Sequence, residues 1–230
     1  MPRISVIIPA YNEAGSIGHV LRDVPGGLVS EIIVVDNNST DNTAEVAKAN
    51  GATVLFQPER GYGNACLAGL AYLKKKSAHE KSDIVVFLDG DYSDYPEKMP
   101  ELICPILNNK ADLVIGSRVL GNAERGSMTI PQIFGNWLAT KLLKHIYKVK
   151  FTDLGPFRAI RYECLEKLNM QDKTYGWTVE MQLKAAKQKM RCTEVAVPYR
   201  KRIGQSKISG TIKGAVLAGY KILYTIFRYS

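Results

Sequence analysis

The chain alternates between two patterns of apolar residues. Short runs rich in valine and isoleucine occupy 4–8, 31–35, 53–56, 84–88 and 112–118, whereas apolar residues recur every three or four positions over 16–24, 44–49, 64–73 and 134–147. The first pattern predicts buried strands and the second predicts amphipathic helices. Because the two alternate along the chain, we expect an α/β fold with a mainly parallel, Rossmann-like central sheet covered by helices on both faces.

Several positions refine these elements. Pro9 is predicted to end the first strand, and Ser39 or Thr40 is predicted to cap the helix that follows the second strand. A late strand is expected over 195–199. In the helix over 134–147, three apolar residues share a face that we expect to pack in the core, namely Leu138, Leu142 and Ile146.

Two aspartates flank a glycine directly after the run 84–88, in the order Asp89, Gly90, Asp91. The carboxyl ends of parallel strands form the edge at which open α/β sheets bind ligands. Two carboxylates at such an edge suit a hard divalent cation that is held jointly with substrate phosphates. An acidic turn without a ligand is the alternative, and the triplet alone does not decide between them.

Composition excludes several classes of protein. At 230 residues the chain is long enough to bury a core without disulfides, and its four cysteines contain no C-x-x-C pair, which indicates packed thiols in a reducing compartment. Its three histidines are isolated, without the spacing of metal ligands. Neither a G-x-G-x-x-G after the first strand nor a Walker A motif is present, which argues against a nicotinamide enzyme and a P-loop protein.

The net charge of +9 is concentrated near the C-terminus. Residues 195–230 contain no acidic side chain and carry seven basic ones: Arg200, Lys201, Arg202, Lys207, Lys213, Lys221 and Arg228. No nucleic-acid-binding motif accompanies them, so we expect no nucleic-acid partner. The apolar residues between them recur at helical spacing, which favours an amphipathic helix over 209–230 on an anionic membrane surface. A helix packed on the core with solvated lysines is the alternative.

The ends of the chain bear on its location. A strand that starts at Ile4 leaves no room for a signal peptide. The longest apolar stretch, 215–227, is interrupted by Lys221 and is shorter than the ~20 residues that span a bilayer. We therefore expect a cytoplasmic protein that is peripheral on the cytosolic membrane face.

Four segments, in their order and spacing, resemble the family 2 glycosyltransferases, which have a GT-A fold: PAYNE at 9–13, VVDNNSTD at 34–41, GYGNA at 61–65 and DGD at 89–91. Two further segments, GSR at 116–118 and TDLGPFR at 152–158, are similar to the branch that contains the dolichyl-phosphate mannose and glucose synthases. The resemblance covers about 4–209 and implies a catalytic domain over 1–208. After Asp91 that branch usually continues with an amide residue and a proline pair, whereas this chain reads YSDYP.

The resemblance implies a nucleotide diphosphate sugar of the GDP-mannose or UDP-glucose type as donor. It places Pro9, Tyr11 and Glu13 beside the base and ribose, and Asp36 at the base, where a carboxylate can accept a hydrogen bond from a ring N–H. Gly61 and Asp89 complete the expected donor site. Asp89 and Asp91 would hold Mg²⁺ or Mn²⁺, which stabilises charge on the departing diphosphate.

The acceptor decides whether the reaction needs a base. A polyprenyl phosphate is already anionic near neutral pH, because its second pKa is about 6, so it needs cations rather than a base. Arg118, Arg202 and Lys207 are the candidates to bind it. A hydroxyl acceptor would need a general base, for which Glu180 is the first candidate and Asp153 the second.

The sequence thus predicts a metal-dependent, inverting hexosyltransferase that acts on a polyprenyl or dolichyl phosphate, with Asp91, Arg118, Asp153 and Glu180 as candidate catalytic residues. One alternative keeps the donor and uses a soluble or protein-bound hydroxyl acceptor. Another is a non-catalytic nucleotide-sugar-binding module. The expected partners are the nucleotide sugar, the lipid acceptor and an anionic membrane surface, and a membrane protein or a second copy of the chain stays open as a further partner.

Overall fold

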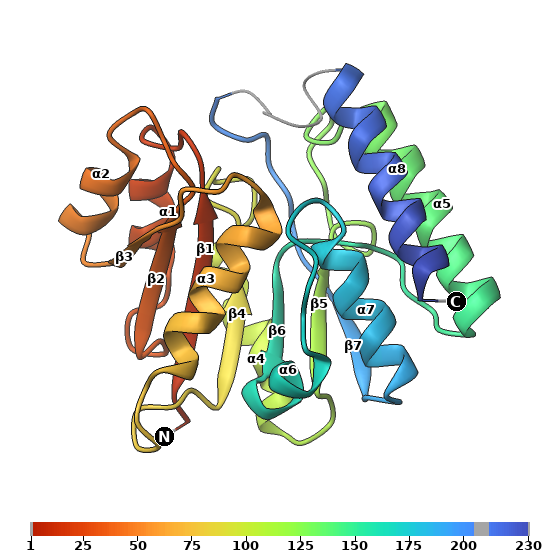
Figure 1. Cartoon of the computed structure of the whole chain (residues 1–230), viewed down its shortest axis with the longest axis horizontal. Helices are drawn as coiled ribbons and strands as arrows, with labels where there is room; N and C mark the ends of the chain where they lie inside the picture. The colour runs from red at the N-terminus through yellow and green to blue at the C-terminus, as the bar shows by residue number, and fades with distance from the viewer. Residues whose placement is uncertain (1, 205–211, 230) are drawn as a thin grey trace.

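The computed structural model describes residues 2–204 and 212–229 and forms one α/β layered structure (Figure 1). Its strands are β1 Ile4–Ala10, β2 Glu31–Asp36, β3 Thr53–Phe56, β4 Ile84–Phe87, β5 Leu113–Ser117, β6 Arg158–Arg161 and β7 Cys192–Ala196. Its helices are α1 Ile17–Asp23, α2 Thr43–Ala49, α3 Tyr62–Lys74, α4 Met99–Leu107, α5 Ile130–Tyr147, α6 Tyr162–Leu168, α7 Trp177–Lys187 and α8 Ile212–Arg228, with the short 3₁₀ turn η1 at Pro96–Lys98.

The strands form one seven-stranded sheet in the order β3-β2-β1-β4-β6-β5-β7. All neighbours pair in parallel except β6, which runs antiparallel to β4 and β5. One apolar cluster packs α1, α2 and α4 against one face, and a second packs α3, α6 and α7 against the other, with α5 and α8 outside α7. The mainly parallel sheet with helices on both faces is therefore as predicted.

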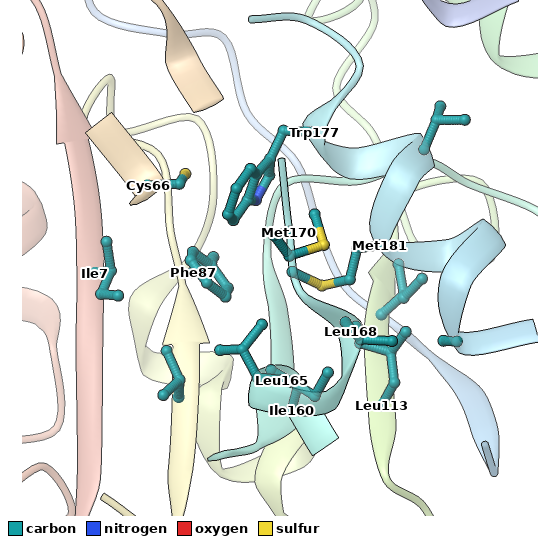
Figure 2. Packing of buried hydrophobic residues seen from close by; sticks show 14 of the residues in the cluster. Ile7, Cys66, Phe87, Leu113, Ile160, Leu165, Leu168, Met170, Trp177 and Met181 are labelled. Atoms are coloured by element: carbon teal, nitrogen blue, oxygen red, sulfur yellow. The ribbon is translucent and has the colours of Figure 1, made fainter. Parts of the chain in front are cut away.

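The larger cluster connects α7 to the strand that leads into the two aspartates. Trp177, at the first position of α7, meets Phe87 of β4 edge to face with 5.9 Å between ring centroids (Figure 2). Both side chains are fully buried. Since Phe87 is only two residues before Asp89, this packing fixes the backbone from which the aspartates emerge.

Four local predictions are wrong. Strand β1 continues past Pro9 to Ala10, because its pairing with β4 ends at Ile7 and proline is tolerated where the ladder on one side has ended. Helix α2 starts after Asn42, whereas Ser39 accepts from the Asn12 N–H and Thr40 donates to the Asn12 side chain. These two bonds join the loops that follow β1 and β2 instead of capping the helix.

The other two errors concern α5 and β7. Helix α5 already begins at Ile130, after a capping box of Thr129 and Gln132, and its buried positions are Ala139, Thr140 and Leu143. Of the residues predicted to face the core, Leu142 packs against the larger cluster, whereas Ile146 is 37% exposed, so the core face is partly rotated from the predicted one. Strand β7 ends at Ala196 because the chain beyond it bends toward the loop after β5, where Tyr199 forms an isolated bridge with Ala123.

Candidate active site

A cavity of about 550 Å³ lies at the carboxyl ends of the central strands. It lies there because β1 and β4 are parallel neighbours, so that the loops leaving them meet at one edge of the sheet. Eight of the predicted site residues line it: Pro9, Tyr11, Glu13, Gly61, Asp89, Asp91, Arg118 and Arg202. The fold thus brings together side chains that are up to 193 positions apart in the sequence, from Pro9 to Arg202.

The two aspartates of the DGD triplet have different environments. One carboxylate oxygen of Asp91 accepts from the backbone N–H and hydroxyl of Ser93, and the other contacts the Arg202 guanidinium. Asp89 Oδ1 is buried and has no hydrogen-bond partner among the described residues. Burial raises the pKa of Asp89, while the positive charges of Arg202 and Arg118 oppose that rise.

These two carboxylates fit a divalent cation that is shared with a substrate. An unpaired buried carboxylate oxygen is costly unless a cation or donor approaches it, and Asp89, which lines the cavity, has such an oxygen. Within residues 2–204 and 212–229, no cluster of three or more histidine, cysteine or acidic side chains could hold a metal by itself. Mg²⁺ is typically held by one or two carboxylates together with substrate phosphates, which matches this pair.

Another part of the cavity wall is formed by the loops after β1, β2 and β3. Arg60 stacks on the Tyr11 ring, with its guanidinium carbon 4.1 Å from the ring centroid. Asn37 accepts from the Gly61 N–H at 2.7 Å and donates to the Glu59 carbonyl. Gly61 has a φ of +143°, and a Cβ there would lie 2.3 Å from the Lys173 carbonyl oxygen, so only glycine fits.

Arg118 is fixed by a buried carboxylate. Its Nε and Nη2 donate to the two oxygens of Asp153 at 2.8 and 2.7 Å, and Asp153 is fully buried. Burial alone would lower the pKa of Arg118, but the charge and hydrogen bonds of Asp153 raise it above its ordinary value. Its guanidinium also lies over the Tyr199 ring, 5.0 Å from the centroid. The result is a permanently cationic group with a fixed direction at the cavity wall.

Four predicted site residues do not line the cavity. Asp36 is buried beside it and accepts from the Ser39 N–H, while its neighbour Asn37 lines the wall. Asp153 lies behind Arg118. Glu180 is fully buried on α7, where it accepts from the backbone N–H groups of Gln171 and Asp172 and from the Tyr229 hydroxyl. Lys207 lies outside the described residues.

Other lining residues were not singled out from the sequence. Asn37 lies inside the segment 34–41 and Arg60 directly precedes the segment 61–65, so nearness to these motifs was the available signal. Tyr199 and the α5 residue Asn136 had no such signal, because they reach the cavity only through the packing of β7 and α5. The arginines of the basic cluster 200–202 have different partners. Arg202 lines the cavity, whereas Arg200 stacks on Tyr92, with its guanidinium carbon 3.4 Å from the ring centroid.

Beyond the cavity, α5 and α8 lie side by side (Figure 1). Both helices expose large apolar side chains. We define the outer face of α5 and α8 by Ile130, Ile133, Phe134 and Trp137 together with Val216, Leu217, Tyr220, Tyr224 and Phe227, all of which are exposed. The apolar residues of α8 at these positions are therefore not core packing. Lys221 ion-pairs with Asp172 at 3.1 Å and so belongs to the inner side of the helix.

No helix within the described residues is both long enough and apolar enough to span a bilayer.

Comparison with known proteins identifies the class of protein that this fold and site belong to. Residues 5–168 match glycosyl transferase family 2. An uncharacterised glycosyltransferase of Mycobacterium tuberculosis is 34% identical over 218 residues, which are 94% of each chain. The undecaprenyl-phosphate mannosyltransferase of Micrococcus luteus is 30% identical, over 92% of this chain and 90% of that protein. The dolichyl-phosphate hexose transferase of Haloferax volcanii is 30% identical, over 93% and 90%.

Solved structures give the same fold. The glucosyl-3-phosphoglycerate synthase of Mycobacterium tuberculosis, in complex with Mn²⁺, uridine diphosphate and glucosyl-3-phosphoglycerate, has a TM-score of 0.76 and 24% identity, over 99% of this chain and 80% of that one. The chain therefore belongs to glycosyl transferase family 2 and has a GT-A fold, as the sequence motifs predicted.

Proposed function

We propose that the protein is a metal-dependent, inverting hexosyltransferase that moves a sugar from a nucleoside diphosphate to a polyprenyl phosphate of the dolichyl type at a membrane surface. The observation that carries the proposal is the arrangement in one cavity of the strand-end pair Asp89 and Asp91 with the guanidinium groups of Arg118 and Arg202. Two transferases of lipid phosphates among the relatives, at 30% identity, support the choice of acceptor.

The donor occupies the side of the cavity formed by β1 and β2. Pro9, Tyr11 and Glu13 flank the base and ribose, with Asn37, Arg60 and Gly61 beside them, and Asp36 acts from behind this wall. Asp89 and Asp91 would hold Mg²⁺ or Mn²⁺, as the Mn²⁺ complex of the structural neighbour supports. When bound, this cation stabilises the negative charge that builds up on the diphosphate as it leaves.

The Asp91 carboxylate contacts the Arg202 guanidinium. If Asp91 held the cation instead, the Arg202 guanidinium would be available to the acceptor phosphate. Arg118, whose direction is fixed by Asp153, binds the same phosphate, and Lys207 is a third candidate. Asp153 is thus a positioning residue.

The acceptor phosphate needs no strong base, because its oxygen is anionic near neutral pH. That oxygen attacks the anomeric carbon from the side opposite the diphosphate, so one C–O bond forms as another breaks and the configuration inverts. The position of Glu180 supports this scheme, since its carboxylate is fully buried on α7 and already bonded to two backbone N–H groups. A hydroxyl acceptor would need a general base, and Glu180 does not line the cavity to act as one.

The test uses labelled UDP-hexoses and GDP-hexoses with a polyprenyl phosphate and Mn²⁺ or Mg²⁺, followed by extraction into organic solvent. Transfer of label to the organic phase, its loss in excess chelator, and a fall of at least about a hundredfold in Asp91→Asn are expected. Asp83→Asn, at an exposed aspartate that accepts from the Arg3 N–H, is the matched control and should keep full activity.

Other outcomes would replace the proposal. Label that reaches only a water-soluble acceptor such as phosphoglycerate would indicate the soluble-acceptor enzyme. Donor binding without transfer to any acceptor would indicate a nucleotide-sugar-binding module. Full activity of Asp91→Asn would remove the metal assignment.

A further inference from the structure

A second cavity, of about 430 Å³, lies between α5 and α8. We call it the interhelical groove. Its α5 side includes Phe134, Gly135 and Leu138, and its α8 side includes Gly219, Ile222 and Leu223. No polar side chain of the described residues lines it. Water finds no hydrogen-bonding side chains in such a groove, whereas a hydrocarbon chain would be well matched to its apolar walls.

The interhelical groove adjoins the active-site cavity. Gly135, Gly219 and Ile222 line both, so the apolar space borders the space that contains Arg118 and Arg202. The combined cavity has cationic and carboxylate groups at its inner end and only apolar groups at its outer end. That polarity matches an amphiphile with an anionic head and a hydrocarbon tail.

Two glycines keep the groove open. A Cβ added at Gly135 or at Gly219 would meet no atom within 4 Å. Glycine is unfavourable in the interior of a helix. Neither Gly135 nor Gly219 has a positive φ or a close backbone contact that would require glycine. What each glycine supplies is room between the two helices.

The helices themselves are held at the other end. The Tyr147 hydroxyl, at the end of α5, donates to the Ile226 carbonyl at 2.6 Å, and Ile226 is fully buried. Lys221 and Asp172 form a second connection between α8 and the loop before α7. The groove therefore lies beside the anchored part of α8, with exposed Phe134 and Val216 at its edge.

We propose that the interhelical groove binds the hydrocarbon chain of the acceptor next to its phosphate, an inference that rests on the proposed function. The phosphate lies at Arg118 and Arg202, and the first isoprene units extend past Gly135 and Gly219 between α5 and α8. The rest of the chain leaves over the outer face of α5 and α8, which is apolar.

The test compares dimethylallyl phosphate, with one isoprene unit, and farnesyl phosphate, with three. Each methylene moved from water into an apolar site contributes roughly a factor of four in affinity, so wild-type kcat/KM should be at least about tenfold higher for farnesyl phosphate. Gly219→Leu and Gly135→Leu fill the groove, and in each the ratio of the two kcat/KM values should fall toward one. Leucine is a better helix former than glycine, so circular dichroism should show intact helices.

The matched control is Gly27→Leu, at a site where a Cβ also meets nothing within 4 Å but which lies in the loop between α1 and β2. It should keep the wild-type ratio. A benzophenone-bearing farnesyl phosphate, crosslinked to the wild-type protein and mapped by mass spectrometry, tests the site without any variant. Its label should fall within 131–138 and 216–223.

The outcomes separate the two proposals. Transfer that does not depend on chain length, or label outside both segments, would overturn the groove and leave the function standing. Absence of transfer to every isoprenyl phosphate would overturn both. Label that disappears as protein concentration rises, together with a dimer in sedimentation, would show that a second copy of the chain occupies the groove and would overturn the inference.

Discussion

Asp94 is a buried carboxyl group that the sequence motifs did not predict as a site residue. It is 2% exposed, and neither of its oxygens has a hydrogen-bond partner among the described residues. Burial, with the nearby negative charge of Asp89, raises the pKa of Asp94 to about 7, although the positive charge of Arg118 opposes the rise. It stands in the segment where this chain departs from the amide and proline pair of the dolichyl-phosphate branch.

The raised pKa predicts how stability depends on pH. A carboxyl group whose pKa moves from 3.8 to about 7 on folding keeps its full contribution below pH 3.8 and loses it as the pH rises through 7. The free energy of unfolding of the wild type, measured with urea in the presence of chelator, should therefore fall between pH 4 and pH 8 by roughly 2–4 kcal/mol more than that of a variant without this carboxyl group. Asp94→Asn should lack this extra fall.

The comparison is between two pH profiles, so a general change in stability does not affect it. Asp83→Asn, at an exposed site, should follow the wild type. Parallel profiles for Asp94→Asn and the wild type would show that the pKa of Asp94 is not raised in the folded protein, and would contradict the prediction.

At the scale of the elements, α5 and α8 act as a pair. Their inner sides pack on α7 and line the interhelical groove, while their outer face exposes tryptophan, tyrosine and aliphatic side chains. An exposed apolar area of this kind usually marks a binding surface. Aromatic side chains such as Trp137 and Tyr220 suit the interface between lipid and water, because one end of each ring is polar.

We therefore expect the wild-type protein to cosediment with vesicles that contain anionic lipid, more strongly at low salt. Replacing Trp137, Leu217 and Tyr220 together by alanine should weaken binding at least about a hundredfold, because each large side chain contributes on the order of 1 kcal/mol or more when it leaves water. The variant should fold normally, since all three side chains are exposed.

Phe56→Ala provides the matched control for vesicle binding. Phe56 is 65% exposed, close to the 66% of Tyr220, but it ends β3 at the opposite edge of the sheet (Figure 1). It should bind vesicles like the wild type. Wild-type protein that ignores anionic vesicles at low salt would contradict the membrane assignment.

At the scale of the whole molecule, the cavity joins two halves of the chain. Tyr11, Asn37 and Arg60 come from the first half, whereas Arg118, Tyr199 and α8 come from the second. A ligand that spans the cavity thus binds only the folded protein and must stabilise it as a unit.

We expect the correct nucleoside diphosphate, at about 100 times the Kd that it has in the presence of Mn²⁺, to stabilise the Mn²⁺-loaded protein by about 2.7 kcal/mol. For a chain of this size the melting temperature should rise by roughly 5–10 °C. In Asp91→Asn the nucleotide should give a much smaller shift, and Mn²⁺ should add little to it. Equal shifts in the variant and the wild type would show that Asp91 does not hold the cation.

The sequence by itself determined the family and the alternation of strands and helices as far as β5, but it predicted no element at α4, β6, α6 or α7. Apolar periodicity is a local signal, so it predicted strand 53–56 to the residue and placed most of the other elements. The motifs identified seven residues that line the active-site cavity, because these motifs follow strands and parallel strands end at one edge. Arg202, the eighth, was predicted from its charge.

Only the tertiary structure decided what each side chain faces. Arg200 and Arg202 are two positions apart, yet one stacks on Tyr92 and the other reaches Asp91. Glu180 was a reasonable base by type, but packing buries it on α7. The interhelical groove arises from two segments about 80 positions apart, and no local pattern reports where such segments meet. Those contacts depend on the packing of whole elements against one another, which periodicity along the chain does not encode.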